Sequence, residues 1–229
     1  MRRNKAIINL SAISACLVLS SCGVKIVTSK DFKQKEIKIT TQFDAIDTYS
    51  TTDIEFAEGE PSMTLYASEK VIDKIEVYVK NGTLIVTQPE SQNFKGFVAS
   101  KLRITYPGKI KKFITGGTGD ITIDSYSTDS LSLICYGTGD IECKKLNADF
   151  IFCETAGTGD IEIKNLFCRS ANLLTEGTGD IEIKGINADF IEATTLGTGD
   201  IILTGSCRNL SQKASGTGDI DTKALKIND

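Results

Sequence analysis

The pentapeptide Gly-Thr-Gly-Asp-Ile occurs six times in this chain, at a spacing of 20 residues that shortens to 19 before the last copy. Within each block apolar residues alternate with polar ones, as in a β-strand with one buried face. A period near 20 residues with this alternation is typical of a β-solenoid, in which each repeat forms one coil. The chain is therefore predicted to be all-β, a parallel β-helix whose regular part spans residues 116–229.

Aligning the blocks brings apolar residues into shared columns. The residue two positions after the conserved Ile is Ile, Leu or Cys in the first five blocks, and a third column is interrupted by Ser206. Because side chains two apart share one face of a strand, these columns are expected to point inward and stack from coil to coil. Glu and Lys columns between them, such as those of Glu162 and Lys164, are expected to form a solvated outer face. The Ile column comprises Ile121, Ile141, Ile161, Ile181, Ile201 and Ile220.

The Gly-Thr-Gly-Asp part of each block is expected to form a sharp corner. Glycine can adopt a positive φ there without a Cβ clash, and Asp or Thr can bond backbone N–H groups that the corner leaves unpaired. A structural role is therefore assigned to both glycines and to the Asp of every copy. These residues are Gly117, Gly119, Asp120, Gly137, Gly139, Asp140, Gly157, Gly159, Asp160, Gly177, Gly179, Asp180, Gly197, Gly199, Asp200, Gly216, Gly218 and Asp219.

The corner Asp residues also suggest an alternative role, because carboxylates stacked ~4.8 Å apart could share Ca²⁺. The Gly- and Asp-rich repeats of calcium-binding β-rolls, however, follow a nine-residue pattern, whereas the period here is 20. Nor does Gly-Thr-Gly-Asp match a phosphate-binding loop, since no Lys-Ser/Thr follows the glycines. Turn capping is favoured over calcium binding, and neither a metal site nor a cofactor is predicted.

The N-terminus predicts export and lipidation. Three basic residues precede an apolar run, which ends in Leu19-Ser20-Ser21-Cys22. This arrangement is typical of a secretory signal, and its last four residues resemble a bacterial lipobox, which would make Cys22 the lipidated first residue of the mature protein. The alternatives are an ordinary signal peptide that contains a Cys, or a core strand. We therefore expect a signal peptide over residues 1–21, a tether over residues 22–35, and attachment to the outer membrane through the N-terminal lipid.

Composition excludes several kinds of chemistry. The chain has no His, which removes His-based acid–base and nucleophilic catalysis. Removal of residues 1–21 leaves 23 basic residues against 30 acidic ones, a net charge of −7, so a nucleic-acid partner is not expected. Five cysteines follow Cys22, without any Cys-x-x-Cys spacing. Cys143 and Cys153 fall in apolar columns, so a role as small core residues is favoured over a redox or metal role.

Residues 36–115 are rich in strand patterns but lack the regular repeat. Residues 52–56 (Thr-Asp-Ile-Glu-Phe) look like a degenerate copy of the repeat, and Asn81-Gly82 predicts a tight hairpin between two strands. Residues 68–88 are expected to form a short helical turn followed by the two strands of that hairpin. Because terminal coils of a solenoid are usually atypical, residues 36–115 are predicted to form an N-terminal β cap made of degenerate coils.

The lipobox, the segment from Phe43 to Thr87 and the serial Gly-[Ser/Thr]-Gly-Asp-Ile blocks together resemble the head GIN domain family. Members of that family are described as "putative autotransporter adhesins" and are common among lipoproteins of Bacteroides-type bacteria. The resemblance covers nearly all of residues 36–229. It implies a β-helical or β-roll fold on a protein of the cell envelope, and it carries no catalytic residue set.

Three functions are compatible with these features. The favoured one is a non-enzymatic envelope lipoprotein that presents a repetitive surface to a glycan or an envelope protein. The second is an assembly module that self-associates through the solenoid ends, because the last block stops after 14 residues and leaves a strand edge. The third, a polysaccharide-active enzyme, is disfavoured because six coils span only ~29 Å and no groove with paired acids is indicated. No enzymatic activity is predicted.

Overall fold

The structure, a computed structural model, describes residues 32–88 and 99–228. Every regular element in these two ranges is a β-strand, and none of their residues belongs to a helix that could cross a membrane. The predictions for residues 1–21 and for Cys22 lie outside the described residues. The strands of the N-terminal part are β1 (Phe32–Glu36), β2 (Ala45–Tyr49), β3 (Thr52–Glu58), β4 (Ser62–Ser68), β5 (Glu76–Lys80), β6 (Thr83–Thr87), β7 (Ser100–Tyr106) and β8 (Lys112–Thr115). Those of the repeats are β9 (Ile121–Cys135), β10 (Ile141–Thr155), β11 (Ile161–Ile163), β12 (Leu166–Thr175), β13 (Ile181–Thr195), β14 (Ile201–Ala214) and β15 (Ile220–Ile227).

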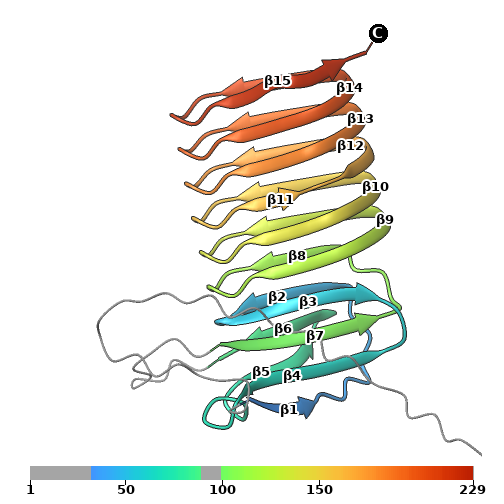
Figure 1. The fold of residues 1–229 in the computed structure, drawn as a ribbon, viewed down its shortest axis with the longest axis vertical. Coiled ribbons are helices and arrows are strands. Elements are labelled where there is room, and N and C mark those ends of the chain that lie inside the picture. The colour runs from blue at the N-terminus through green and yellow to red at the C-terminus, as the bar shows by residue number, and fades with distance from the viewer. Residues whose placement is uncertain (1–31, 89–98, 229) are drawn as a thin grey trace, which may run out of the picture.

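The repeats stack as parallel coils, which confirms the predicted β-solenoid. Ile121 of β9 pairs with Ile141 of β10, and the same register continues through Ile161 to the last coil. Each long strand runs along one side of the coil, bends, and returns along the other side (Figure 1). The Gly-Thr-Gly-Asp loops protrude along one edge of the stack, and the bends form the opposite edge (Figure 1).

The inward columns form the core, as predicted. The Ile column is fully buried from Ile121 to Ile201, whereas Ile220 of the last coil is partly exposed. The third apolar column is interrupted at Gly205 and not at Ser206. The last full coil is one residue shorter, so its register shifts after Ile183 and Gly205 lies opposite Ile186. Gly205 has a φ of 125°, and a Cβ there would lie 2.2 Å from the Ile186 carbonyl oxygen. The shorter coil therefore keeps its pairing with the preceding coil through a backbone conformation that glycine allows at position 205.

The N-terminal part begins the solenoid with imperfect coils. Strand β3 lies parallel to β9 with Ile54 opposite Ile121, which confirms residues 52–56 as a degenerate copy of the repeat. Strands β2 and β8 are likewise parallel, whereas β1, β4 and β5 pair antiparallel with their neighbours and close this end of the stack. Because β1 begins at Phe32, the last residues of the predicted tether belong to the sheet.

The local predictions for this part also have clear outcomes. Asn81 and Gly82 connect β5 to β6 with φ angles of 52° and 76°, as expected for a tight hairpin turn. The expected helical turn is a single turn, in which the Ser68 carbonyl oxygen accepts hydrogen bonds from the amides of Val71 and Ile72.

A buried polar column lies beside the Gly-Thr-Gly-Asp loops and was missed in the sequence. It consists of Thr115, Cys135, Thr155, Thr175 and Thr195, all fully buried. Their side chains donate to corner glycine carbonyls, for example from Thr195 Oγ1 to the Gly199 oxygen at 3.0 Å and from Cys135 Sγ to the Gly139 oxygen at 3.2 Å. The column thus satisfies corner carbonyls that point into the core.

Candidate functional site

The Asp column forms a ladder between coils. Asp160 N donates to Asp140 Oδ1 at 2.8 Å, and Asp180 N donates to Asp160 Oδ1 at 2.8 Å. The same contact joins every corner, and the first rung is an Asp53 carboxylate that accepts from the Asp120 amide at 3.2 Å. The carboxylate therefore bonds the corner of the next coil and not its own, so the predicted capping role becomes a structural role that links adjacent coils.

The corner glycines are required for space and not for a special φ angle, which corrects the sequence interpretation. None of the corner glycines has φ in the left-handed region. A Cβ at Gly159 would instead lie 2.2 Å from the Gly139 carbonyl oxygen, and one at Gly179 would lie 2.0 Å from the Gly159 oxygen. At every glycine of the six corners the nearest atom of the neighbouring coil would lie 1.9–2.3 Å from the new carbon. Coils approach so closely here that no side chain fits between them.

The corner ridge has no features of a metal site in the part of the chain that the structure describes. No group of three or more potential metal ligands occurs among the described residues. One carboxylate oxygen of each Asp from Asp120 to Asp200 already accepts the amide of the next coil. The five described cysteines, all outside disulfides, belong to no such group either, and burial raises the pKa of the Cys143 thiol to about 12. Burial of Cys143 and Cys153 confirms their core role.

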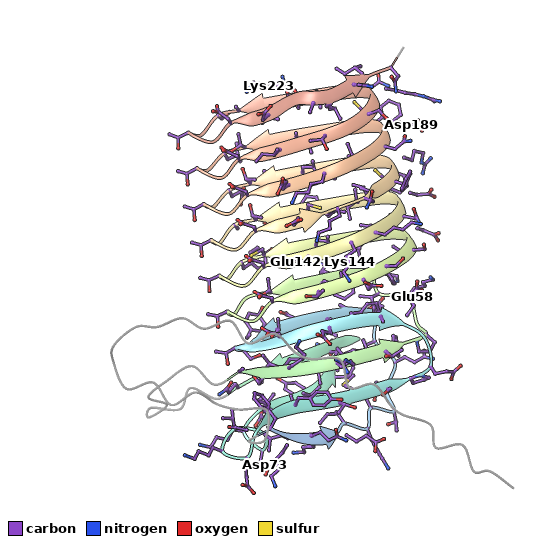
Figure 2. All side chains as sticks on the ribbon, viewed as in Figure 1. Glu58, Asp73, Glu142, Lys144, Asp189 and Lys223 are labelled. Carbon is purple, nitrogen blue, oxygen red and sulfur yellow. The ribbon has the colours of Figure 1, made fainter. Side chains whose placement is uncertain are left out.

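The outward Glu and Lys columns form exposed ion pairs, as expected. Lys184 Nζ lies 2.8 Å from a carboxylate oxygen of Glu162 on the preceding coil and 3.4 Å from one of Glu182 on its own strand. Glu142 and Lys144 lie on the same outer face (Figure 2). Exposed pairs of this kind contribute ~0–1 kcal/mol each, so they indicate a solvated face.

A concave site lies on the opposite edge of the coils. A hollow of about 690 Å³ covers the bends of β9, β10 and β12 and is bounded below by the loop between β7 and β8. Asp129, Asn147, Asp149, Phe167 and Arg169 line it from successive coils. The register places Asn147 beside Phe167, so residues from coils 20 positions apart become neighbours.

An aromatic side chain holds the floor of the hollow in place. Tyr126, where the next three coils have Leu or Ile, is fully buried and packs edge-on against Phe56 and Phe113. Its hydroxyl donates to the Ile110 carbonyl oxygen at 2.8 Å and accepts from the Ile110 amide at 2.5 Å. Both polar groups of Ile110 are thus bonded to one rigid ring. The loop is therefore fixed to the first coil.

The two lysines of this loop have their charges compensated. Lys109 Nζ lies 2.7 Å from a Glu58 carboxylate oxygen and also donates to the Ser127 carbonyl oxygen at 2.7 Å. Lys111 Nζ lies 3.0 Å from a carboxylate oxygen of Asp44. Figure 2 shows Glu58 on the same edge of the molecule as Asp189, which belongs to a higher bend. These lysines therefore shape the hollow but add little net charge to it.

The remaining charged groups of the hollow are available to a ligand. The Arg169 guanidinium carbon lies 4.4 Å from the centroid of the Phe150 ring, and Arg169 forms no ion pair with any described residue. The carboxylates of Asp129 and Asp149 neither pair with a cation nor accept a hydrogen bond within residues 32–88 and 99–228. Phe167 beside them is 48% exposed. The hollow thus combines hydrogen-bond acceptors, a donor and an aromatic face.

Sequence reasoning missed this site, although a signal was present. The bend reads Asn-Ala-Asp-Phe at residues 147–150 and 187–190, but Phe-Cys-Arg-Ser at 167–170 and Ser-Cys-Arg-Asn at 206–209. From residue 147 on, the bend sequence therefore alternates from coil to coil, whereas the corner is the same in every coil, and the first bend, Ser-Thr-Asp-Ser at 127–130, matches neither form. The bend sequence is therefore not set by the coil geometry that fixes the corner sequence. Burial raises the pKa of the Cys168 thiol to about 12, so this residue of the hollow is no nucleophile at neutral pH.

Comparison with solved structures places this architecture among known relatives. A putative adhesin from Bacteroides fragilis is 27% identical, with a TM-score of 0.64 over 87% of this chain and 98% of that one. A protein from Parabacteroides distasonis described as a putative lipid binding protein gives the same TM-score and coverage at 19% identity. A putative adhesin from Parabacteroides merdae gives 0.52 at 17% identity, again over 87% and 98% of the two chains. The last two likenesses show the fold alone.

A comparison with curated proteins found no match. The family described as "Putative auto-transporter adhesin, head GIN domain" matches residues 42–166 and 154–229, which together include the cap from residue 42 onward, all six corners and the hollow. The two matched ranges cover more than half of the chain. The chain therefore belongs to the head GIN domain family.

Proposed function

We propose that this protein is a non-enzymatic binding module of the cell envelope that presents its solenoid surface to a glycan or to another envelope protein. The observation that carries this proposal is the hollow on the bends, which gathers unpaired polar groups and an exposed aromatic ring on a rigid scaffold. Binding sites are usually concave and preformed, and a solenoid holds its surface side chains at fixed spacing. Family membership supports the same reading, because the family is described by adhesion.

A catalytic role is less compatible with the same hollow. A glycoside hydrolase needs one carboxylic acid that keeps its proton at neutral pH, which burial in an apolar pocket supplies. Asp129 and Asp149, the carboxylates of the hollow, are both exposed. The thiol of Cys168 has its pKa raised, which is the opposite of what a nucleophile requires. These residues suit recognition better than bond cleavage.

Attachment to the outer membrane through a lipid on Cys22 is part of the proposal, and it rests on the lipobox sequence. If Cys22 is acylated, the Cys22→Ala variant will be found in the soluble fraction or will retain its signal peptide. The wild-type chain will partition into detergent. Equal partitioning of the two proteins would exclude lipidation at this residue while leaving the binding role open.

Beads coated with the full chain test the binding role directly. We expect them to be retained on immobilised cell-envelope material more strongly than beads coated with the heat-denatured chain. Periodate treatment of the envelope material removes glycan ligands and protease treatment removes protein ligands, so the two treatments distinguish the partner classes. Retention equal to that of the denatured control would refute the proposed function. Release of new reducing ends from a polysaccharide would instead support the enzymatic alternative.

A further inference from the structure

The hollow on the bends of β9, β10 and β12 has the chemistry of a carbohydrate site, and we propose that it binds an uncharged glycan. This inference rests on the proposed function and names its site and ligand class.

The aromatic ring supplies a platform for a sugar. Phe167 points outward from the bend and is 48% exposed, so its ring face is available without any rearrangement of the core. The C–H face of a pyranose ring can pack on such a ring and bury apolar area on both partners. Asn147 lies beside Phe167 in register on the preceding coil, which places an amide next to the platform. A stacked sugar would therefore meet a polar group at its edge.

Donors and acceptors are mixed in the hollow as a polyol requires. Each sugar hydroxyl can donate one hydrogen bond and accept others, so it needs both kinds of partner. Asp129 and Asp149 supply acceptors, the Arg169 guanidinium supplies donors, and Asn147 supplies both. The Arg169 guanidinium stacks on the Phe150 ring, which already restricts the Arg169 side chain. Ligand binding would therefore cost less side-chain entropy than it would at a mobile arginine. An apolar lipid chain would leave all of these groups without partners.

The charge of the hollow favours an uncharged ligand over an acidic one. The ammonium groups of Lys109 and Lys111 are already paired with carboxylates. What remains unpaired is two carboxylates, Asp129 and Asp149, against the single guanidinium of Arg169. An acidic sugar or a phosphate group would therefore meet net negative charge, whereas neutral hydroxyls can bond to all three groups.

A glycan array tests this inference with the full chain in detergent. The array carries neutral hexose oligosaccharides and, as a separate arm, oligosaccharides of similar length that contain uronates. We expect the wild-type chain to bind members of the neutral arm more strongly than the uronate arm. Phe167→Ala and Asp149→Ala should each weaken binding to the best neutral ligand by at least about tenfold, as for contact residues at the centre of an interface.

Phe190→Ala is the matched control. Phe190 is an exposed phenylalanine of another bend, 54% accessible, and lies outside the hollow, so its removal should leave binding within about twofold of the wild-type value. All three variants change exposed side chains, and equal melting temperatures will verify that each is folded. Binding weakened equally by Phe190→Ala, or stronger binding to the uronate arm, would overturn the proposed site. Absence of glycan binding by a chain that is still retained on protease-sensitive envelope material would overturn this inference but keep the proposed function.

Discussion

Replacing Gly159 with Ala tests why the corners contain glycine. The new Cβ would lie 2.2 Å from the Gly139 carbonyl oxygen and 2.8 Å from Cys135 Sγ, whereas ordinary contact begins at 3.4 Å. Adjacent coils must therefore separate by about 1 Å at this corner. That movement stretches the bonds from Thr158 N to the Gly137 oxygen at 2.9 Å and from Asp160 N to the Asp140 carboxylate at 2.8 Å.

The magnitude follows from these bonds. Loss of both bonds at ~0.5–1.5 kcal/mol each lowers the free energy of unfolding by about 1–3 kcal/mol. The lower entropy of the unfolded Ala chain offsets about 0.4–1 kcal/mol of this loss. For a chain of this size the remaining destabilisation of about 0.5–2.5 kcal/mol corresponds to a melting temperature lower by about 1–10 °C.

Thermal unfolding followed by circular dichroism measures the effect, with Thr158→Ala as the control at an exposed neighbouring position, where less than about 0.5 kcal/mol should be lost. Gly159→Asn separates the two explanations for the glycine. If space is limiting, Asn will be at least as damaging as Ala; if a positive φ were needed, Asn would be tolerated better. A melting temperature within about 1 °C of wild type for Gly159→Ala would refute the close-packing argument.

Three further predictions concern the ladder and the thiols. Asp160→Asn keeps an oxygen that can accept from the Asp180 amide and should cost less than about 0.5 kcal/mol, whereas Asp160→Ala should cost about 1 kcal/mol in the same unfolding measurement. Millimolar calcium should leave the melting temperature unchanged, and a rise of several degrees that Asp160→Asn weakens would show that the ladder binds the ion. Burial raises the pKa of Cys143 from 9.0 to about 12, so the folded state holds its proton more tightly than the unfolded state. The free energy of unfolding in urea should therefore be constant below about pH 9 and fall above it, and a flat profile to about pH 11 would contradict the burial of the thiols.

The regular coils were predictable because the repeated pentapeptide shows which residues of successive coils are equivalent. Once the Gly-Thr-Gly-Asp-Ile copies are superimposed, the inward columns follow from the alternation along a strand, and Ile121 to Ile201 are buried as expected. The degenerate coil at residues 52–56 was found in the same way. The antiparallel strands of the cap could not be derived, since they have no repeat to set their register and depend on contacts with distant segments.

The errors at the corners have one physical origin. The sequence shows that every corner contains glycine, but it does not show why. A positive φ angle and a lack of space for a Cβ would both select glycine. Only the distance to the neighbouring coil distinguishes them, as at Gly159. The hollow was missed for a related reason, because Asn147 and Phe167 become neighbours only after the coils are stacked in register. The column that contains Cys135 was likewise hidden, since Thr and Cys share little in hydropathy but fill the same volume.

The ladder of aspartates has a consequence for how such chains change in length. Each coil makes the same contacts with the coil before it as with the coil after it. The Asp160 amide, for example, donates to the Asp140 carboxylate, and the Asp160 carboxylate accepts from the Asp180 amide. A 20-residue unit can therefore be gained or lost between two coils without altering the contacts that either retains. Each such event lengthens or shortens the stack by ~4.8 Å. Duplication of short gene segments would thus adjust the reach of the protein in equal steps, while the cap and the bends already present keep their structure.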